Sequence, residues 1–290
     1  MCYKMYLQTG GVMTLTGEAV DLSAASVSLS SGWTWLGYPL FAPTALGTTG
    51  ALRALVASDF TDGDVIKSQS SFTTYVQNYG WYGSLSKLED GQAYMFNLAA
   101  SNTLTFVASS RRRELATEHM SQRFDASAQP GSSAPDEWRV IPGAFEASMC
   151  VTAFVIIDGA ASADGVLAAF TDDSLRGVTA ASSSPAPVGP YKGYHAFNLM
   201  VYGQASAESA TLTFRFRHAD GHTSHLSGSV VFSADGSIGS LYHPLVITSA
   251  NAEDTMASLS PPTSRSSMAK AGWASAEEAK RDQVRKSTSQ

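Results

Sequence analysis

Three of the six histidines of the chain lie close together in the segment His218-Ala219-Asp220-Gly221-His222-Thr223-Ser224-His225. An Asp-Gly pair accepts the backbone angles of a tight hairpin turn, so histidines on the two flanking strands could face one another at ligand distance. A zinc site, however, needs three or four converging ligands and further groups that orient each imidazole. We therefore interpret this segment as a hairpin with exposed histidines and expect no metal site there.

Carboxylates gather at two further turns, Asp62-Gly63-Asp64 and Asp172-Asp173. Clustered carboxylate oxygens suit Ca²⁺, but the spacing of an EF-hand loop is absent and turns account for these residues without an ion. The sequence also contains no Gly-x-Ser-x-Gly, no Gly-x-Gly-x-x-Gly and no Walker A loop. These are the common signatures of hydrolases and nucleotide-binding proteins. We expect a protein without enzymatic activity and without a cofactor.

Aromatic side chains are the remaining candidates for binding. Tyr79, Trp81 and Tyr82 lie in a glycine-flanked segment, where we expect them to be exposed. Large rings with polar edges stack on sugars or anchor protein interfaces, so this trio is a candidate contact surface for a protein or a polysaccharide. Trp33 and Trp35 instead lie on one face of a strand pattern, and we expect both indoles in the core.

The bulk composition limits the possible partners. A net charge of −6 and a pI near 5.5 argue against nucleic acid, whose phosphates require a basic face. The apolar stretch of residues 151–157, interrupted only by Thr152, is far shorter than the ~20 residues needed to span a bilayer. Cys2 and Cys150 form no C-x-x-C motif, and the sequence does not decide whether they pair with each other.

The elements that would position these residues are strands. Asp-Gly occurs six times, and between these turn signals residues 210–217 alternate apolar and polar side chains. Residues 149–157 and 196–202 are almost continuously apolar, which is typical of central strands covered on both faces. Long helical periodicity is absent before residue 250. We expect an all-β fold that consists of two antiparallel β-sandwich or barrel-like modules and a short C-terminal helical tail.

Length and composition together divide the chain into five parts. At 290 residues it exceeds the usual size of a single core. A polar stretch that contains Arg111-Arg112-Arg113 indicates a linker, and the tail carries a capping-box pattern, Ser275 with Glu278. The expected parts are an edge strand or the end of a preceding repeat at 1–13, a Trp-rich β module at 14–108, a linker at 109–135, a second module at 136–250 and a polar tail with a short helix at 251–290.

The beginning of the chain has the pattern of a strand separated from its module. Cys2-Tyr3-Lys4-Met5-Tyr6-Leu7 repeats, in degenerate form, the pattern of residues 93–98, which suggests a fragment of a longer repeat protein. A strand without its own sheet has unpaired backbone groups and recruits a partner strand. Tyr3 and Tyr6 are therefore candidate interface residues, and the expected partner is another copy of the chain or a neighbouring repeat.

Several motifs of the first module resemble a known repeat. They are Gly32-Trp33-Thr34-Trp35-Leu36-Gly37-Tyr38-Pro39, Gly63-Asp64-Val65-Ile66-Lys67-Ser68-Gln69, Gly80-Trp81-Tyr82-Gly83-Ser84-Leu85 and Gly91-Gln92-Ala93-Tyr94. Together they resemble the Trp-rich β modules of large secreted and cell-surface proteins of Bacteroidetes-type bacteria and marine algae. With a similar companion module after it, the resemblance covers roughly residues 14–248. It implies an extracellular, non-catalytic protein with no established ligand.

Two functions follow from these expectations. The favoured one is a structural or adhesive module of an extracellular or cell-surface assembly, which acts through protein–protein contacts and can form filaments when the contact does not close. The alternative is a carbohydrate-binding module that uses the loop of Tyr79, Trp81 and Tyr82. Neither nucleic-acid binding nor membrane insertion is expected.

Overall fold

The computed structural model describes residues 26–40, 43–46, 59–89, 91–106, 138–205 and 209–249. Within these ranges the chain is mostly β, and its helical structure is limited to short 3-10 turns such as Pro142–Ala144. The predicted all-β class is therefore confirmed for this part of the chain. None of its helices has the length and apolar character needed to cross a membrane. The expected edge strand with Tyr3 and Tyr6, the linker and the helical tail lie outside the described residues.

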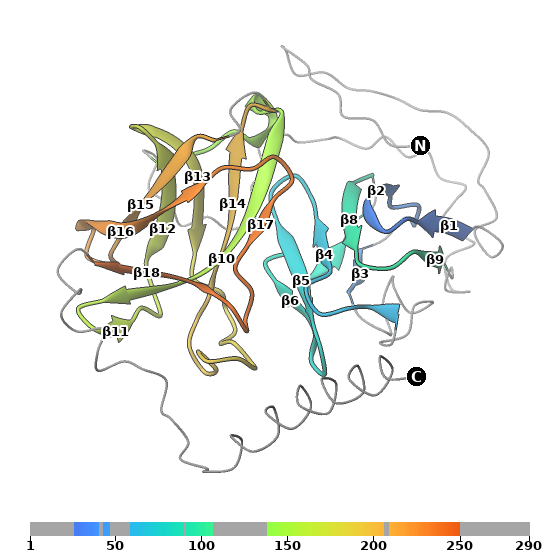
Figure 1. Ribbon diagram of the computed structural model, residues 1–290, viewed down its shortest axis with the longest axis horizontal. Helices are drawn as coiled ribbons and strands as arrows, with labels where there is room; N and C mark the ends of the chain where they lie inside the picture. The colour runs from blue at the N-terminus through green and yellow to red at the C-terminus, as the bar shows by residue number, and fades with distance from the viewer. Residues whose placement is uncertain are drawn as a thin grey trace, which may run out of the picture. The chain divides into compact units, whose positions relative to one another are not determined.

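The first part of the described chain forms a five-stranded sheet in which every pairing is antiparallel, as the sequence predicts. Two antiparallel pairs of short strands accompany it (Figure 1). The sheet has the spatial order β2 (Gly32–Gly37), β8 (Ala93–Leu98), β4 (Val65–Lys67), β5 (Phe72–Val76) and β6 (Gly80–Gly83). The pairs are β1 (Ser26–Leu29) with β9 (Asn102–Thr105), and β3 (Thr44–Ala45) with β7 (Lys87–Leu88).

The core of this first part lies on one face of the sheet. Leu36, Ile66 and Phe96 come from three neighbouring strands, and they pack in one buried cluster with Leu29 and Leu104 from the β1–β9 pair. Alternate side chains of a strand point to the same face, which is why alternate residues of β8, Tyr94, Phe96 and Leu98, enter the cluster. The cluster fixes which side of β2, β4 and β8 is turned inward.

The two tryptophans of β2 are not in this core, contrary to the prediction. Leu36 and Tyr38 are buried, whereas Trp35 is 53% exposed and Trp33 is half-buried. Since successive side chains of a strand point to opposite faces, only one of the two alternating sets can be turned inward. The set of Leu36 and Tyr38 is turned inward here, so the large rings of the other set did not identify the inner face.

The second part of the described chain forms a nine-stranded sheet bent into a half-barrel. Strands β10 and β14 are buried on both faces, and β15 alternates buried and more exposed residues, as their sequences predict. The main path of the sheet is β11 (Ala160–Ala161), β10 (Ala147–Ile157), β18 (Leu245–Ser249), β16 (Thr223–Val231), β15 (Thr211–Arg217), β12 (Val166–Thr171) and β13 (Ser174–Ala180). Two more strands pair with β10 beside this path, β14 (Phe197–Gly203) and β17 (Ser237–Ile238).

Two pairings of this sheet are parallel, β10 with β17 and β10 with β18. The prediction of a purely antiparallel second module is wrong at these pairings. Strand β18 lies between β10 and β16 and runs antiparallel to β16, which precedes it along the chain. This orientation leaves it parallel to β10, from which it is separated by almost a hundred residues.

Strand β13 returns against the backbone of β14 at a glycine. A Cβ atom on Gly177 would lie 2.3 Å from the carbonyl oxygen of Met200, so only glycine permits this approach. Inside the bent sheet, Val151, Leu199 and Phe214 belong to one buried apolar cluster. The close contact of β13 with β14 therefore helps to enclose that cluster.

Candidate functional site

Residues of both sheets pack together in two buried clusters. The described residues from 26 to 249 all belong to one compact unit. The division of the chain at a linker stays a prediction. One cluster combines Val65 and Phe72 with Val140, Cys150, Met200 and Tyr202, and the other combines Val76 and Tyr82 with Phe154, Ala186, Ala196 and Leu241.

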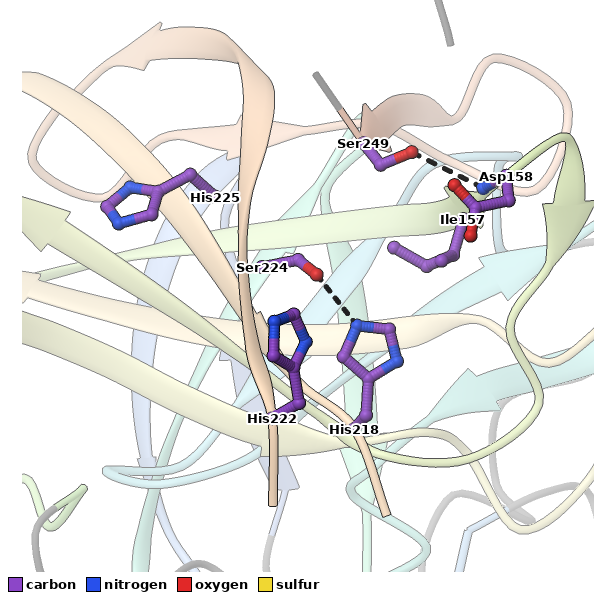
Figure 2. Close-up of a pocket in the computed structure, with 7 residues that line it drawn as sticks. All are labelled: Ile157, Asp158, His218, His222, Ser224, His225 and Ser249. Atoms are coloured by element: carbon purple, nitrogen blue, oxygen red, sulfur yellow. Dashed lines mark hydrogen bonds between the residues drawn. The ribbon is translucent and has the colours of Figure 1, made fainter. Parts of the chain in front are cut away.

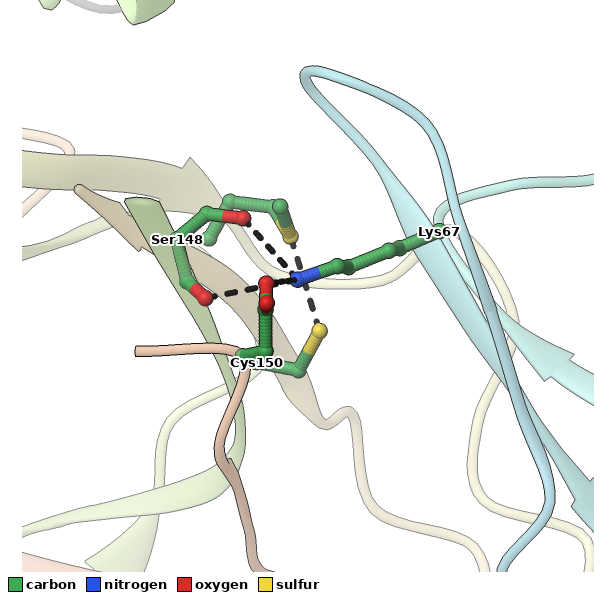
Figure 3. A network of polar contacts seen from close by, with 5 residues as sticks. Lys67, Ser148 and Cys150 are labelled. Carbon is green, nitrogen blue, oxygen red and sulfur yellow. Dashed lines mark hydrogen bonds and ion pairs between the residues drawn. The ribbon is translucent and has the colours of Figure 1, made fainter. Parts of the chain in front are cut away.

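The side chain of Lys67 reaches from the first sheet to the second (Figure 3). It is the last residue of β4, and its side chain is almost wholly enclosed. Its Nζ donates to Asp235 Oδ1 at 2.6 Å and to Ser148 Oγ at 3.2 Å, and it lies 4.5 Å from the ring centroid of Trp33. Burial of an ammonium group costs several kcal/mol unless such partners replace water. The lysine therefore ties β4 to β10 and to the turn that contains Asp235.

A second polar contact between the sheets lies close to the first in sequence. The hydroxyl of Tyr202 donates to the carbonyl oxygen of Gln69 at 2.9 Å, and burial raises the pKa of this phenol. Lys67 and Gln69 belong to the motif Gly63–Gln69, which carries part of the sequence resemblance. Two residues of this motif thus contact the second sheet.

Cys150 lies in the same buried region, but its thiol is poorly suited to chemistry. Its Sγ is 3.7 Å from Met200 Sδ, to which it donates a weak hydrogen bond. Burial raises the pKa of Cys150 to about 12, although the positive charge of Lys67 acts in the opposite direction. Because the thiolate is the reactive form, a cysteine with this pKa is a weak nucleophile at neutral pH. With the ammonium of Lys67 paired as well, this cluster is suited to joining the sheets.

The three aromatic residues singled out from the sequence occupy different environments. Tyr82 is buried between the sheets, where its hydroxyl is 2.9 Å from Ser182 Oγ and donates to the carbonyl oxygen of Ser184 at 3.0 Å. Trp81 packs edge-on against Phe60. Tyr79 is 50% exposed. The structure thus leaves one ring of the trio for contact with a partner.

The histidines of the hairpin line an open recess of about 380 Å³, next to the end of β10 and the start of β16 (Figure 2). His218 Nε2 is 2.8 Å from Ser224 Oγ, and the rings of His218 and His222 are 5.4 Å apart. His225 lies apart from this pair. No group of three or more His, Cys, Asp or Glu side chains in the described ranges is arranged to hold a metal ion.

The aspartates of the first acidic turn are used to fix the backbone. Asp64 accepts hydrogen bonds from the backbone N–H groups of Thr61 and Ala99, both at 2.8 Å. Asp62 accepts another from Gln77 N at 3.0 Å. Burial raises the pKa of Asp64, and the two hydrogen bonds act against that shift. These hydrogen bonds to the backbone account for the carboxylates at this turn, and no bound ion is needed to explain them.

The ion pair between Lys67 and Asp235 was not predicted from the sequence. One signal was present, because an ionisable side chain ends the otherwise apolar strand Val65–Lys67. For Asp235 the sequence indicated only a turn, from the pair Asp235-Gly236, and the residue does adopt a positive φ of 57°. Nothing in the sequence pattern connects two residues that are 168 positions apart.

No protein-family model, no curated protein and no solved structure was found to match this chain.

Proposed function

We propose that this chain is a non-catalytic structural or adhesive module of an extracellular or cell-surface assembly, and that it works through contacts with other protein chains or neighbouring repeats. The observation that carries the proposal is the exposed indole of Trp35 on strand β2. This strand is at the edge of the first sheet, and among the described strands it pairs with β8 alone. The extracellular location rests on the resemblance to Trp-rich β modules.

The edge position of β2 favours a protein partner for a simple reason. An edge strand presents backbone N–H and C=O groups to its surroundings, and a strand from another chain can complete them. Trp35 adds a large apolar surface at the same place. Aromatic rings are frequent anchors of protein interfaces because they bury much area with few rotatable bonds.

The contact between the two sheets supports the same function. It shows that residues of the recognised motifs, Lys67 and Gln69, can hold one β-sheet against another. Tyr82, expected from the sequence to be a contact residue, also takes part in this packing. We infer that β modules of this type join to their neighbours by similar packing, which would produce a filament if each contact is head-to-tail.

The test is the particle mass of the full chain, measured by light scattering at the concentration reached in purification, together with electron microscopy of the same sample. We expect particles much heavier than the 30.6 kDa chain, and a clear fall in their mass for Trp35→Ser. The melting temperature should hardly change, since an exposed substitution alters stability by about 0.5 kcal/mol or less. Tyr194→Ser, at an equally exposed ring elsewhere, is the matched control. A monomeric parent would refute the proposal.

A further inference from the structure

Three half-exposed tyrosines lie on loops that meet at one end of the two sheets. Tyr79 and Tyr194 are each 50% exposed and Tyr242 is 38% exposed. Tyr79 is in the turn between β5 and β6, Tyr194 is in the loop 181–196 between β13 and β14, and Tyr242 follows β17. We call these three residues the tyrosine surface.

A chain of contacts brings the first two loops together. The ring of Tyr79 meets that of Tyr82 edge-on, with centroids 6.4 Å apart. The Tyr82 hydroxyl in turn holds Ser182 and Ser184, at the start of the loop that carries Tyr194. The tyrosine surface therefore includes residues of both sheets, and it continues directly from the buried contact between them.

The third loop joins through a glycine. A Cβ atom on Gly189 would lie 1.9 Å from the carbonyl oxygen of Leu241, so the loop between β13 and β14 rests directly on the backbone next to Tyr242. Tyr191 is stacked on Phe154 at 4.8 Å and meets Tyr194 edge-on at 6.4 Å. Both contacts hold the loop close to the sheet while Tyr194 stays exposed.

The loops are held in shape before any ligand binds. Ala186 N donates to Tyr194 O and Gly193 N donates to Ala186 O, both at 2.8 Å. The loop between β13 and β14 also contains Pro185, Pro187 and Pro190, which limit its backbone freedom. A surface that is already ordered loses less conformational entropy on binding than a flexible one.

We propose that the tyrosine surface binds a neutral polysaccharide. Its three segments, residues 77–82, 182–195 and 240–244, contain one lysine and no arginine, aspartate or glutamate. An anionic polymer would require several cations, as nucleic-acid sites illustrate. The faces of tyrosine rings suit the apolar faces of sugar rings, and the phenol hydroxyls can bond to sugar hydroxyls.

The composition around the rings favours a sugar polymer over a protein. The aliphatic side chains of these segments are withdrawn, since Leu241 is buried and Val188 is partly buried. The same segments also contain exposed polar residues, Asn78, Ser183 and Lys192 among them. A protein interface usually has a continuous apolar centre inside a polar rim. Separate rings at the tips of turns are better matched to successive units of an extended glycan.

The experiment is affinity electrophoresis of the full chain in native gels that contain laminarin, hydroxyethylcellulose or galactomannan, with carboxymethylcellulose as an anionic comparison. We expect at least one neutral polymer to retard the parent protein. The triple variant Tyr79→Ser, Tyr194→Ser, Tyr242→Ser should bind that polymer at least tenfold more weakly. Val231→Ser changes a similarly exposed apolar residue that belongs neither to the tyrosine surface nor to the edge strand β2, and it should bind like the parent. Melting temperatures check that each variant is folded.

Two results would overturn this inference: no retardation of the parent by any neutral polymer, whether or not carboxymethylcellulose retards it, or equal retardation of the parent and the triple variant. If no polysaccharide binds and the triple variant has a lower particle mass than the parent, the tyrosine surface is a protein contact. The inference is independent of the assembly proposal, which is judged by the particle mass of the parent and of Trp35→Ser.

Discussion

The ion pair between Lys67 and Asp235 joins two residues with unequal access to water. The Lys67 side chain is 2% exposed and the Asp235 side chain is 43% exposed. If the ammonium is removed, water can solvate the carboxylate that is left. If the charge of the carboxylate is removed, the ammonium stays enclosed with Ser148 and the ring of Trp33 as its neighbours. An enclosed ion without a counter-ion is the more costly of the two situations.

We therefore expect Asp235→Asn to destabilise the protein more than Lys67→Met does. Asparagine tolerates the positive φ of this position, so the change tests charge rather than backbone strain. The expected cost is about 2 kcal/mol for Asp235→Asn and about 1 kcal/mol or less for Lys67→Met. Urea denaturation measures both free energies of unfolding. The double variant should resemble Lys67→Met, and the reverse order of the two single variants would contradict this account.

Residue roles were only partly predictable from the sequence. Tyr79, Trp81 and Tyr82 were grouped because they are neighbours along the chain, but a strand turns adjacent side chains to opposite faces. Tyr82 consequently enters the contact between the sheets, whereas Trp81 packs against the core of the first sheet. Tyr79 precedes the strand, in the turn, and is half-exposed. Tyr194 and Tyr242 were not recognised, because their proximity to Tyr79 depends on how the loops pack.

Strands β13 and β14 are in direct backbone contact at Gly177, which makes this glycine informative at the scale of whole elements. Gly177→Ala should force the two backbones apart, because its Cβ would lie 2.3 Å from Met200 O and no flexible side chain can yield there. We expect a loss of about 1–3 kcal/mol in the free energy of unfolding. Gly143→Ala is the control, since the nearest atom to its Cβ would be Gln69 Nε2 at an ordinary 3.6 Å.

Thermal melting of both glycine variants gives the comparison. The Gly143→Ala protein should melt within about 2 °C of the parent, and the Gly177→Ala protein several degrees lower. Equal melting temperatures for the two variants would show that β13 is not seated on β14 in solution. The position of β13, the last strand on the main path of the nine-stranded sheet, would then differ from the one described above.

At the scale of elements, sequence periodicity predicted more than it did for single residues. The alternation of residues 210–217 and the apolar runs at 149–157 and 196–202 correspond to β15, β10 and β14. The same periodicity could not predict the parallel pairing of β10 with β18, because alternation along a strand is the same whichever way its neighbour runs. It also could not assign the inner face of β2, where both alternating sets contain large apolar residues.

At the scale of the whole molecule, burial makes one thiol and several phenol groups harder to ionise. Burial raises the pKa of Cys150 to about 12 and also raises the pKa values of Tyr82, Tyr191 and Tyr202. Three of these four residues lie in the two clusters that span the sheets, and Tyr191 packs against one of them. Ionisation of these groups at high pH should therefore weaken the contact between the sheets.

Stability should consequently fall on the alkaline side. In an unfolded chain a thiol ionises near pH 8.5 and phenols near pH 10. Above these values the unfolded state binds fewer protons than the folded state, so the free energy of unfolding decreases as pH rises. The contribution of Cys150 is fully present below about pH 8.5 and is lost as pH approaches 12. Urea midpoints measured from pH 7 to pH 11 should stay level at first and then decline.

Cys150→Ala separates the thiol from the phenols in this decline. The variant lacks the group that ionises first on unfolding, so its stability should begin to fall about one pH unit later than that of the parent. Its absolute stability will be lower because a cavity replaces the sulfur, but the onset of the decline does not depend on that offset. A parent protein whose stability stays level to pH 11 would contradict this account, since its thiol and phenols would then ionise as readily when folded as when unfolded.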